Sequence, residues 1–214
     1  MDPYISFTLS YVTQDFKFRS VALENKPFPG SHTSDAILQS LENSLTDWGL
    51  PTEIPTFCVR DNGANLKAAV RKSGAWYDIA CFAHTLQLAI ADAISASDGM
   101  ENMLGKCKRI VTHYHHSCVA SERINTHQRA MNQAEYDFVM SCPTRWNSQY
   151  AMVRRLLLLK ESVCADIASV GDVENLTTAE WKLAEGFAAQ LESLAEATEV
   201  SSGEKYPLSQ WLFH

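Results

Sequence analysis

The order in which strand-like and helix-like apolar patterns follow one another limits the folds open to this chain. Near the amino terminus, the segment YISFTLSYV places Ile5, Phe7, Leu9 and Tyr11 on one side of an extended strand and hydroxyl side chains on the other. The segment FKFRSVAL follows after a short polar turn. Together, the two segments predict an amino-terminal β-hairpin with one buried face.

Beyond the hairpin, helix-like and strand-like segments alternate. A helix is predicted from a capping Thr33 or Ser34 to Gly49. The strands TFCVRD and YDIACF are then each followed by a helix, ANLKAAVRK and HTLQLAIADAI. Such alternation is typical of a mixed sheet with helices packed on it, an α/β fold. After residue 100 the periodicity predicts only helices, over roughly 101–116, 119–140, 145–169 and 177–201.

Composition and cysteine usage narrow the cellular setting. Hydrophobic residues make up 46% of the chain and charged residues 20%, which is typical of a globular protein. The six cysteines include no C-x-x-C pair, a pattern of reduced intracellular thiols. No signal peptide precedes the first strand, and the most apolar run is interrupted by His84, Gln87 and Asp92. We therefore expect a soluble intracellular chain without a membrane segment.

The net charge of −7 is unevenly distributed. Residues 101–160 hold nine Lys and Arg against four Asp and Glu, whereas the flanking segments are acidic. Nucleic-acid binding depends on local neutralisation of phosphates, so residues 101–160 are the candidate DNA-contacting segment. A solvated helical surface with mixed charges explains the same excess. Neither a G-x-S-x-G motif nor a glycine-rich phosphate loop is present, so the sequence gives no support for a nucleophilic triad or a nucleotide site.

Asp61 is the first residue that could carry chemistry. It ends the strand TFCVRD and is followed by the polar turn NGAN. In open α/β sheets, ligands gather at the carboxyl ends of strands, where a carboxylate can hold a divalent cation. Alternatively, Asp61 caps the next helix by accepting a hydrogen bond from the amide of Gly63 or Ala64.

Cys81 and His84 form a C-x-x-H pair at the next junction between a strand and a helix. One cysteine and one histidine are half of a tetrahedral zinc site. The segment HYHHSC could supply further ligands, although its spacing matches no zinc-finger pattern. The other interpretation is a small buried thiol and a hydrogen-bonded histidine at the start of a helix.

Arg145 and Trp146 stand before a strongly apolar helical segment, where a helix start alone does not require them. In a structural role, the tryptophan is an apolar side chain that closes the edge of the sheet, and the arginine pairs with a carboxylate such as Asp61 or stacks on an aromatic ring. In a functional role, the arginine holds a phosphate and the tryptophan stacks on an extruded base.

Three motifs, in this order, resemble the catalytic domain of hAT-superfamily (hobo/Activator-type) transposases: CVRDNGANLKAAV, CFAHTLQLAI and SCPTRWNSQYAMVRRLL. More closely, the chain resembles the domesticated, BED-zinc-finger-associated proteins derived from those transposases. The resemblance covers nearly the whole chain. It implies a partial RNase H-like fold with a mixed sheet over residues 1–160, and a helical segment over residues 161–214 that begins the family's helical insertion.

The resemblance also implies roles for the residues singled out above. The family cuts and pastes DNA with two metal ions held by an Asp-Asp-Glu triad. Asp61 matches the second aspartate of the triad, and Cys81 and His84 match a C-x-x-H motif near the active site. Arg145 and Trp146 match an Arg-Trp pair in which the tryptophan assists the handling of a flipped base beside the cut.

The sequence departs from the family pattern in ways that affect catalysis. The first aspartate would lie upstream of YISFTLSYV and the glutamate beyond the helical insertion, and Ser141 stands where the family usually has an acidic residue. One triad carboxylate of three, a vestigial Asp61, is therefore expected. A lone carboxylate holds Mg²⁺ poorly, so we expect the ancestral Mg²⁺ or Mn²⁺ to be lost, no other cofactor, and no enzymatic activity.

The leading hypothesis is a non-catalytic nuclear domain, derived from a transposase and truncated relative to the family, that acts in DNA-associated or protein–protein interaction and transcription regulation. One alternative is a DNA strand-transfer enzyme whose missing carboxylates lie outside this chain. Another is a truncated gene product without independent function. The expected partners are DNA, through residues 101–160, or a protein or second copy of the chain, but no small-molecule substrate.

Overall fold

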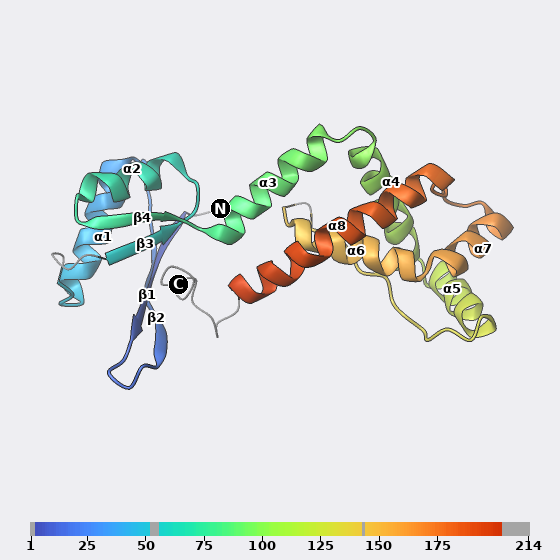
Figure 1. Cartoon of the computed structure of the whole chain (residues 1–214), viewed down its shortest axis with the longest axis horizontal. Helices are drawn as coiled ribbons and strands as arrows, with labels where there is room; N and C mark the ends of the chain where they lie inside the picture. The colour runs from blue at the N-terminus through green and yellow to red at the C-terminus, as the bar shows by residue number, and fades with distance from the viewer. Residues whose placement is uncertain (1–2, 52–55, 143, 203–214) are drawn as a thin grey trace. The chain divides into compact units, whose positions relative to one another are not determined.

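The computed structural model describes residues 3–51, 56–142 and 144–202. These residues form two compact units that divide between Thr85 and Leu86 (Figure 1). The first unit holds β1 (Tyr4–Val12), β2 (Phe18–Pro27), α1 (Ser34–Asp47), β3 (Thr56–Arg60), α2 (Ala64–Ser73), β4 (Trp76–Ala80) and the start of α3 (Phe82–Ala96). The second holds the rest of α3 with α4 (Met100–His116), α5 (Cys118–Ala130), α6 (Trp146–Leu158), α7 (Lys160–Val170) and α8 (Thr178–Ser202).

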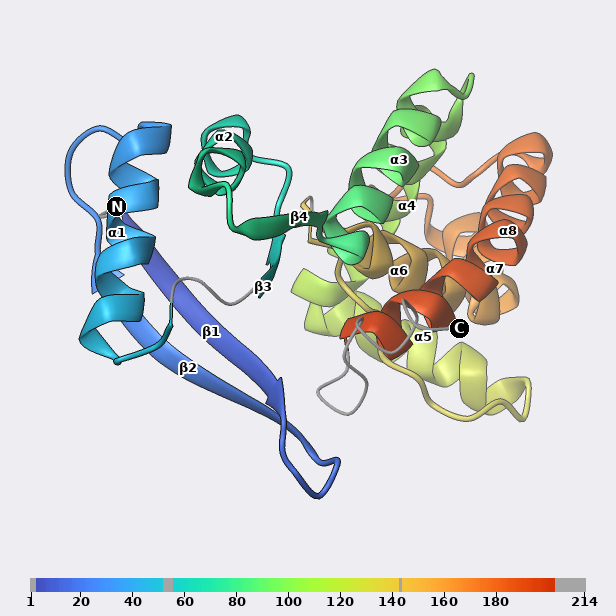
Figure 2. The same ribbon diagram turned by 60° about the vertical axis from the view of Figure 1, so that its left-hand side comes forward.

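The predicted amino-terminal hairpin is confirmed. β1 and β2 pair antiparallel, from Tyr4 opposite Pro27 to Val12 opposite Phe18. The register shifts after Phe7, because β2 contributes one extra residue there. Ile5 and Phe7 are partly buried against α1, whereas the turn end of the hairpin extends past that helix (Figure 2).

The prediction of one mixed sheet is wrong for the described residues. β3 and β4 pair parallel to each other, in a sheet separate from β1 and β2. No strand in the described part of the chain hydrogen-bonds to both pairs. What unites the unit is a small core around Ile37, Leu41 and Ala69, against which side chains of both sheets pack, among them Phe7 and Trp76. The first unit is thus α/β, with two small sheets sharing helices α1 and α2.

The second unit is entirely helical in its regular structure, and its core lies mainly among α4, α6, α7 and α8 (Figure 2). Helix α4 shows why this sequence folds in this way: one face carries apolar residues at helical spacing, and all of them are buried. They are Met103, Leu104, Cys107, Ile110, Val111 and Tyr114. The mostly helical α/β architecture predicted for the chain as a whole is confirmed.

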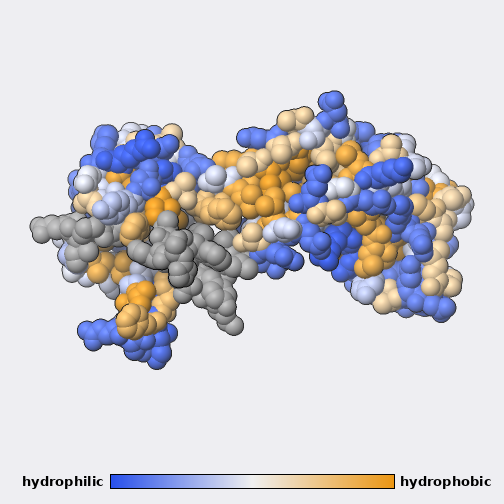
Figure 3. Space-filling view, viewed as in Figure 1, coloured by the Kyte–Doolittle hydropathy of each residue, from blue (hydrophilic) through white to orange (hydrophobic). Residues whose placement is uncertain are grey.

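Helix α3 carries more apolar side chains than the fold buries. Ile90 is its one buried residue, and Phe82 and Leu88 are 45% and 42% exposed. Figure 3 shows apolar side chains gathered along this helix.

In the described part of the chain, no helix is both long enough and apolar enough to cross a membrane. The expected family boundary between residues 160 and 161 stays a prediction, distinct from the division into compact units.

Candidate functional site

Asp61 follows β3 directly and shapes the turn into α2. Its Oδ1 accepts a hydrogen bond from the Gly63 N–H at 2.9 Å, and Gly63 itself occupies the N-cap position without a side-chain bond. A Cβ added to Gly63 would lie 2.9 Å from the same Oδ1, so the turn fits only glycine without a shift. The carboxylate therefore satisfies one free amide at the helix start. Its role as a vestigial catalytic residue stays a prediction.

Cys81 and His84 lie at the neighbouring junction, where β4 leads into α3, and both are half-buried. The Cys81 N–H donates to the Arg60 carbonyl oxygen at 2.6 Å, which continues the pairing of β3 with β4. The Thr85 hydroxyl donates to the Cys81 carbonyl oxygen at 2.9 Å and accepts from the Asn62 amide at 3.4 Å. The bond from Asn62 to Thr85 connects the turn after β3 with the start of α3.

Arg60, the last residue of β3, forms an ion pair with Asp78 on the neighbouring strand β4. Arg60 is 7% exposed and donates to the Asp61 carbonyl oxygen at 2.7 Å and to Asp78 Oδ2 at 2.9 Å. Arg71 contacts the same carboxylate at 3.2 Å. The hydrogen bond from Arg60 lowers the pKa of Asp78, against the opposing effect of burial, and Arg71 adds to it.

The described residues bring no group of three or more His, Cys, Asp and Glu side chains into a metal-binding arrangement. At the edge beside Asp61, the other nearby carboxylate, Asp78, is already bound by Arg60 and Arg71. Mg²⁺ requires several converging oxygen ligands, so the described side chains here do not fit a two-metal centre. The expected loss of the ancestral Mg²⁺ or Mn²⁺ stays a prediction.

Arg145 and Trp146 belong to the second unit, at the start of α6. The Trp146 side chain is 3% exposed and forms part of the helical core, with its ring 6.3 Å from that of Tyr150. Arg145 is exposed and occupies the N-cap position in an extended conformation. The structure therefore separates the two residues: one packs inside and the other faces solvent.

Hydrogen bonds to residues outside the helix hold the start of α6 in place. The Trp146 N–H donates to Gln87 Oε1 at 2.9 Å, although Arg145 makes no side-chain capping bond. The Ser148 hydroxyl accepts from the Cys142 N–H at 2.8 Å and donates to the Arg145 carbonyl oxygen at 2.7 Å. The bond from Trp146 satisfies an amide that a helix start leaves without an intrahelical partner, and the Ser148 bonds fix the residues that precede the helix.

A cavity of about 310 Å³ adjoins Trp146. Its lining comes from α3, α4, α6 and the segment before α6, and it includes Gln87, Lys108, Ser141 and Gln149. Most of the Trp146 surface faces the core, since only 3% is exposed. The cavity therefore offers polar side chains to a ligand, and too little exposed indole surface for a base to stack on.

The second unit also contains a buried polar cluster that the sequence patterns did not predict. Asp166 on α7 is fully buried and accepts from the Tyr114 hydroxyl at 3.0 Å and from Arg123 Nε at 2.9 Å. Arg123 also donates to Asp172 at 2.7 Å, and Asp172 lies 3.2 Å from His113 Nε2. The sequence does contain a sign of this cluster: an aspartate stands within the apolar helical segment ESVCADIASV, and a solvated helix face does not explain its position.

The charge state of this cluster follows from its contacts. Burial raises the pKa of the Asp166 carboxyl, but hydrogen bonds from Arg123 and Tyr114 outweigh burial, so the pKa lies below its usual range. Burial, together with the adjacent Asp166 carboxylate, raises the pKa of Tyr114. The cluster is therefore an ionised pair with a neutral phenol, and it connects α4, α5 and α7.

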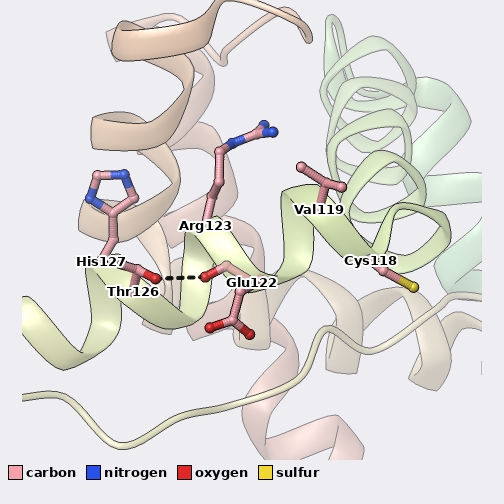
Figure 4. Close-up of a pocket in the computed structure, with 6 residues that line it drawn as sticks. All are labelled: Cys118, Val119, Glu122, Arg123, Thr126 and His127. Atoms are coloured by element: carbon pink, nitrogen blue, oxygen red, sulfur yellow. Dashed lines mark hydrogen bonds between the residues drawn. The ribbon is translucent and has the colours of Figure 1, made fainter.

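An open groove of about 520 Å³ includes Arg123 of this cluster in its lining, and Figure 4 shows the residues that line it. All of its lining residues come from α5: Cys118, Val119, Glu122, Arg123, Thr126 and His127. Val119 is 72% exposed, and the Thr126 hydroxyl donates to the Glu122 carbonyl oxygen at 2.9 Å. Because a single helix lines it, the groove is a surface of α5 rather than an enclosed ligand site.

Most of the positive charge of residues 101–160 is neutralised within the fold. Five of the nine basic side chains form ion pairs with carboxylates: Lys106, Arg123, Arg129, Arg154 and Lys160. Among the described residues, Lys108, Arg109, Arg145 and Arg155 have no acidic side chain within 4.0 Å. The candidate DNA-contacting segment therefore has four cations without a carboxylate partner, of which Arg155 already donates to the Asp137 carbonyl oxygen and lies over the Tyr136 ring.

The two units together contain the features of a transposase-derived domain. Asp61, Cys81 and His84 lie at strand ends in the α/β unit, and Arg145 and Trp146 begin a core helix of the helical unit. The first three residues belong to one compact unit and the last two to the other. The sequence model of the ZBED1 RNase-like helical domain matches residues 79–189, just over half of the chain. The chain belongs to this family.

Individual relatives agree with the family assignment. Human zinc finger BED domain-containing protein 6 is 30% identical over 181 residues, which cover 82% of this chain, and its mouse counterpart is 29% identical. Human zinc finger BED domain-containing protein 4 is 21% identical over 179 residues, or 84% of this chain. These matches confirm the resemblance to domesticated, BED-zinc-finger-associated proteins derived from hAT transposases. The chain spans only 18%, 18% and 15% of the lengths of these three relatives.

Proposed function

We propose that this chain is a non-catalytic, transposase-derived interaction domain that acts in the nucleus, with an RNase H-like ancestry in its α/β unit. The observation that carries the proposal is the burial of Trp146. With 3% of its surface exposed, the indole stabilises the helical core and does not present a ring face to a flipped base. A residue used by the ancestral enzymes on DNA serves the fold here.

The arrangement around Asp61 supports the absence of catalysis. Its Oδ1 accepts from the Gly63 amide, and the nearby Asp78 is engaged by Arg60. Two-metal phosphoryl transfer needs several carboxylates that converge on the ions. We therefore propose that Mg²⁺ and Mn²⁺ do not bind productively and that no zinc is held by Cys81 and His84. Elemental analysis that finds one zinc per chain, lost in Cys81→Ser, would contradict the second statement.

Charge favours protein partners over DNA. Five basic side chains of residues 101–160 are paired within the fold, and the segments before and after are acidic. A DNA-binding face needs unpaired cations that can displace counterions from phosphates. Contact with DNA through Lys108, Arg109, Arg145 and Arg155 is the weaker candidate, since these four are the cations left over.

A combined cleavage and binding assay tests the proposal. The purified chain is incubated with Mg²⁺ or Mn²⁺ and DNA that carries hAT-type terminal repeats, and its affinity for hairpin DNA is measured at several salt concentrations. We expect no nicking or joining, and weak binding without preference for the hairpin. Metal-dependent cleavage that disappears in Asp61→Asn would refute the proposal and favour the strand-transfer enzyme.

A further inference from the structure

The cavity beside Trp146 is lined by polar side chains that the fold leaves without a partner. The Lys108 ammonium, the Gln149 amide and the Ser141 hydroxyl make no hydrogen bond or ion pair with any described residue. Gln87 accepts from the Trp146 N–H through Oε1, so its NH2 group is likewise unbonded within the described part of the chain. All of these side chains can donate hydrogen bonds, and Lys108 carries a positive charge. The cavity therefore suits a ligand that supplies acceptors and a negative charge.

The same cavity contains open space above a glycine. Its apolar lining includes Leu104 and Met152, which are 7% and 1% exposed, and Gly105 of α4. No described residue outside its own helix lies within 4 Å of a Cβ added at Gly105, so close packing does not require a glycine at this position. Glycine inside a helix is destabilising relative to alanine, and protein interiors are normally closely packed. The space above Gly105 is therefore available to an apolar side chain from another molecule.

Charge differs between the two ends of the cavity. Glu101 and Lys108 both line it and lie about two helical turns apart on α4. A hydrogen bond with Thr144 lowers the pKa of the Cys142 thiol. The charges of Arg145 and Lys108 lower this pKa further, so both cations lie near the thiol. The Lys108 end of the cavity is therefore positive and the Glu101 end negative, and a ligand carboxylate belongs at the Lys108 end.

We propose that this cavity binds a short peptide segment of a partner protein in which an apolar side chain stands next to Asp or Glu. The apolar side chain fills the space above Gly105, and Lys108 and the NH2 group of Gln87 bind the adjacent carboxylate. A volume of about 310 Å³ is at the lower limit of small-molecule sites, which suits one or two side chains. A DNA backbone fits less well, because its phosphates bring no apolar group and Glu101 repels them. This binding mode presupposes the proposed interaction function and gives it a site.

Variants of Gly105 and Lys108 test the site with fluorescein-labelled peptides of sequence SGEXEDGS, in which X is Leu, Met or Phe. Fluorescence anisotropy should show saturable binding of at least one peptide to the 214-residue chain below about 1 mM. Gly105→Phe fills the space with its own ring and should weaken this binding by at least about tenfold. Lys108→Ala removes the charge and should weaken it by about fivefold. Peptides with Ser at X, or with Gln in place of the acidic residues, should bind correspondingly more weakly.

Gly105→Ala and Lys182→Ala are the matched controls, because alanine leaves most of the space open and Lys182 is an exposed lysine of α8 outside the lining. Both should bind the peptides within about twofold of the original chain. Circular dichroism must show that the variants are folded; if Gly105→Phe is not, Lys108→Ala and the altered peptides decide.

Absence of saturable binding would overturn the peptide site. So would equal binding by Gly105→Phe and Gly105→Ala, equal binding by Lys108→Ala and Lys182→Ala, or hairpin DNA that displaces the peptide and binds more tightly, since the last result assigns the cavity to phosphates. None of these outcomes bears on the proposed absence of catalysis, which the cleavage assay decides.

Discussion

Arg123 holds Asp166 with two hydrogen bonds, from Nε at 2.9 Å and from a terminal nitrogen at 3.0 Å, inside the helical unit. The carboxylate is fully buried, and the guanidinium is 28% exposed. This contact joins α5 to α7, two helices that share few apolar core residues, because α5 contributes only Ala120 and Ile124 to the buried cluster. The position of α5 therefore depends on this ion pair as well as on apolar packing.

Loss of the Asp166 charge should destabilise the chain. Asp166→Ala leaves the Arg123 guanidinium and the Tyr114 hydroxyl without their shared acceptor, and we expect the free energy of unfolding to fall by about 3–5 kcal/mol. Chemical denaturation followed by circular dichroism measures the change. Asp172→Ala is the control, since Asp172 is 30% exposed and its loss should cost much less. Equal effects of the two substitutions would argue against a special role for the buried carboxylate.

Acid should weaken the fold through the same carboxylate. The pKa of Asp166 is lowered in the folded chain, so the folded state binds fewer protons than the unfolded state. The resulting stability is complete above the unfolded pKa of about 3.9 and is lost as the pH falls through the folded pKa. Asp78 follows the same rule. Unfolding titrations from pH 7 to pH 3 should show declining stability, with a shallower decline in Asp166→Asn.

Trp146→Ala should remove a core aromatic side chain and lower the free energy of unfolding by about 3–5 kcal/mol. Arg145→Ala, at the adjacent exposed position, should change it by no more than about 0.5 kcal/mol. Thermal stability and hairpin DNA binding are measured on the same samples. Reduced DNA binding by Trp146→Ala at an unchanged melting temperature is the result that would assign the indole to DNA instead of the core.

Asp61 offers a test of the turn that precedes α2. Asp61→Ala removes the acceptor of the Gly63 N–H, which should cost about 1 kcal/mol of stability. Asp61→Asn keeps an oxygen at the same position and should retain most of that contribution. If the two variants unfold alike, the hydrogen bond to Gly63 contributes little and the carboxylate has another role.

Local patterns in the sequence predicted much of the fold. The alternation in YISFTLSYV was enough for the hairpin, and helices α4 and α8 lie within one residue of their predicted limits. The helix predicted over 119–140 ends at Ala130, where Met131 and Asn132 turn the chain and Gln128 accepts from the Tyr136 N–H. These contacts join residues on either side of the turn, so the apolar periodicity could not reveal them.

The sheet and the site were less accessible to sequence reasoning. Periodicity identifies strands but not which strands pair, and so the two separate sheets were predicted as one. The buried environment of Trp146 depends on α3, α4 and α8, which lie far from it in sequence. The partners of Asp166 likewise come from two other helices. Pairing and burial of this kind follow from tertiary packing, which no local pattern contains.

The bond from the Trp146 N–H to Gln87 also bears on the order of events during folding. Its two partners are 59 positions apart, and Arg145 provides no side-chain cap of its own. A growing chain exposes Gln87 well before Trp146 is synthesised. The Trp146 amide of α6 thus gains its acceptor only when the helix packs against Gln87 on α3, whereas the Ser148 bonds form locally. We expect the Trp146 amide to become protected from hydrogen exchange later than amides in the middle of α6, whose acceptors lie within the helix itself.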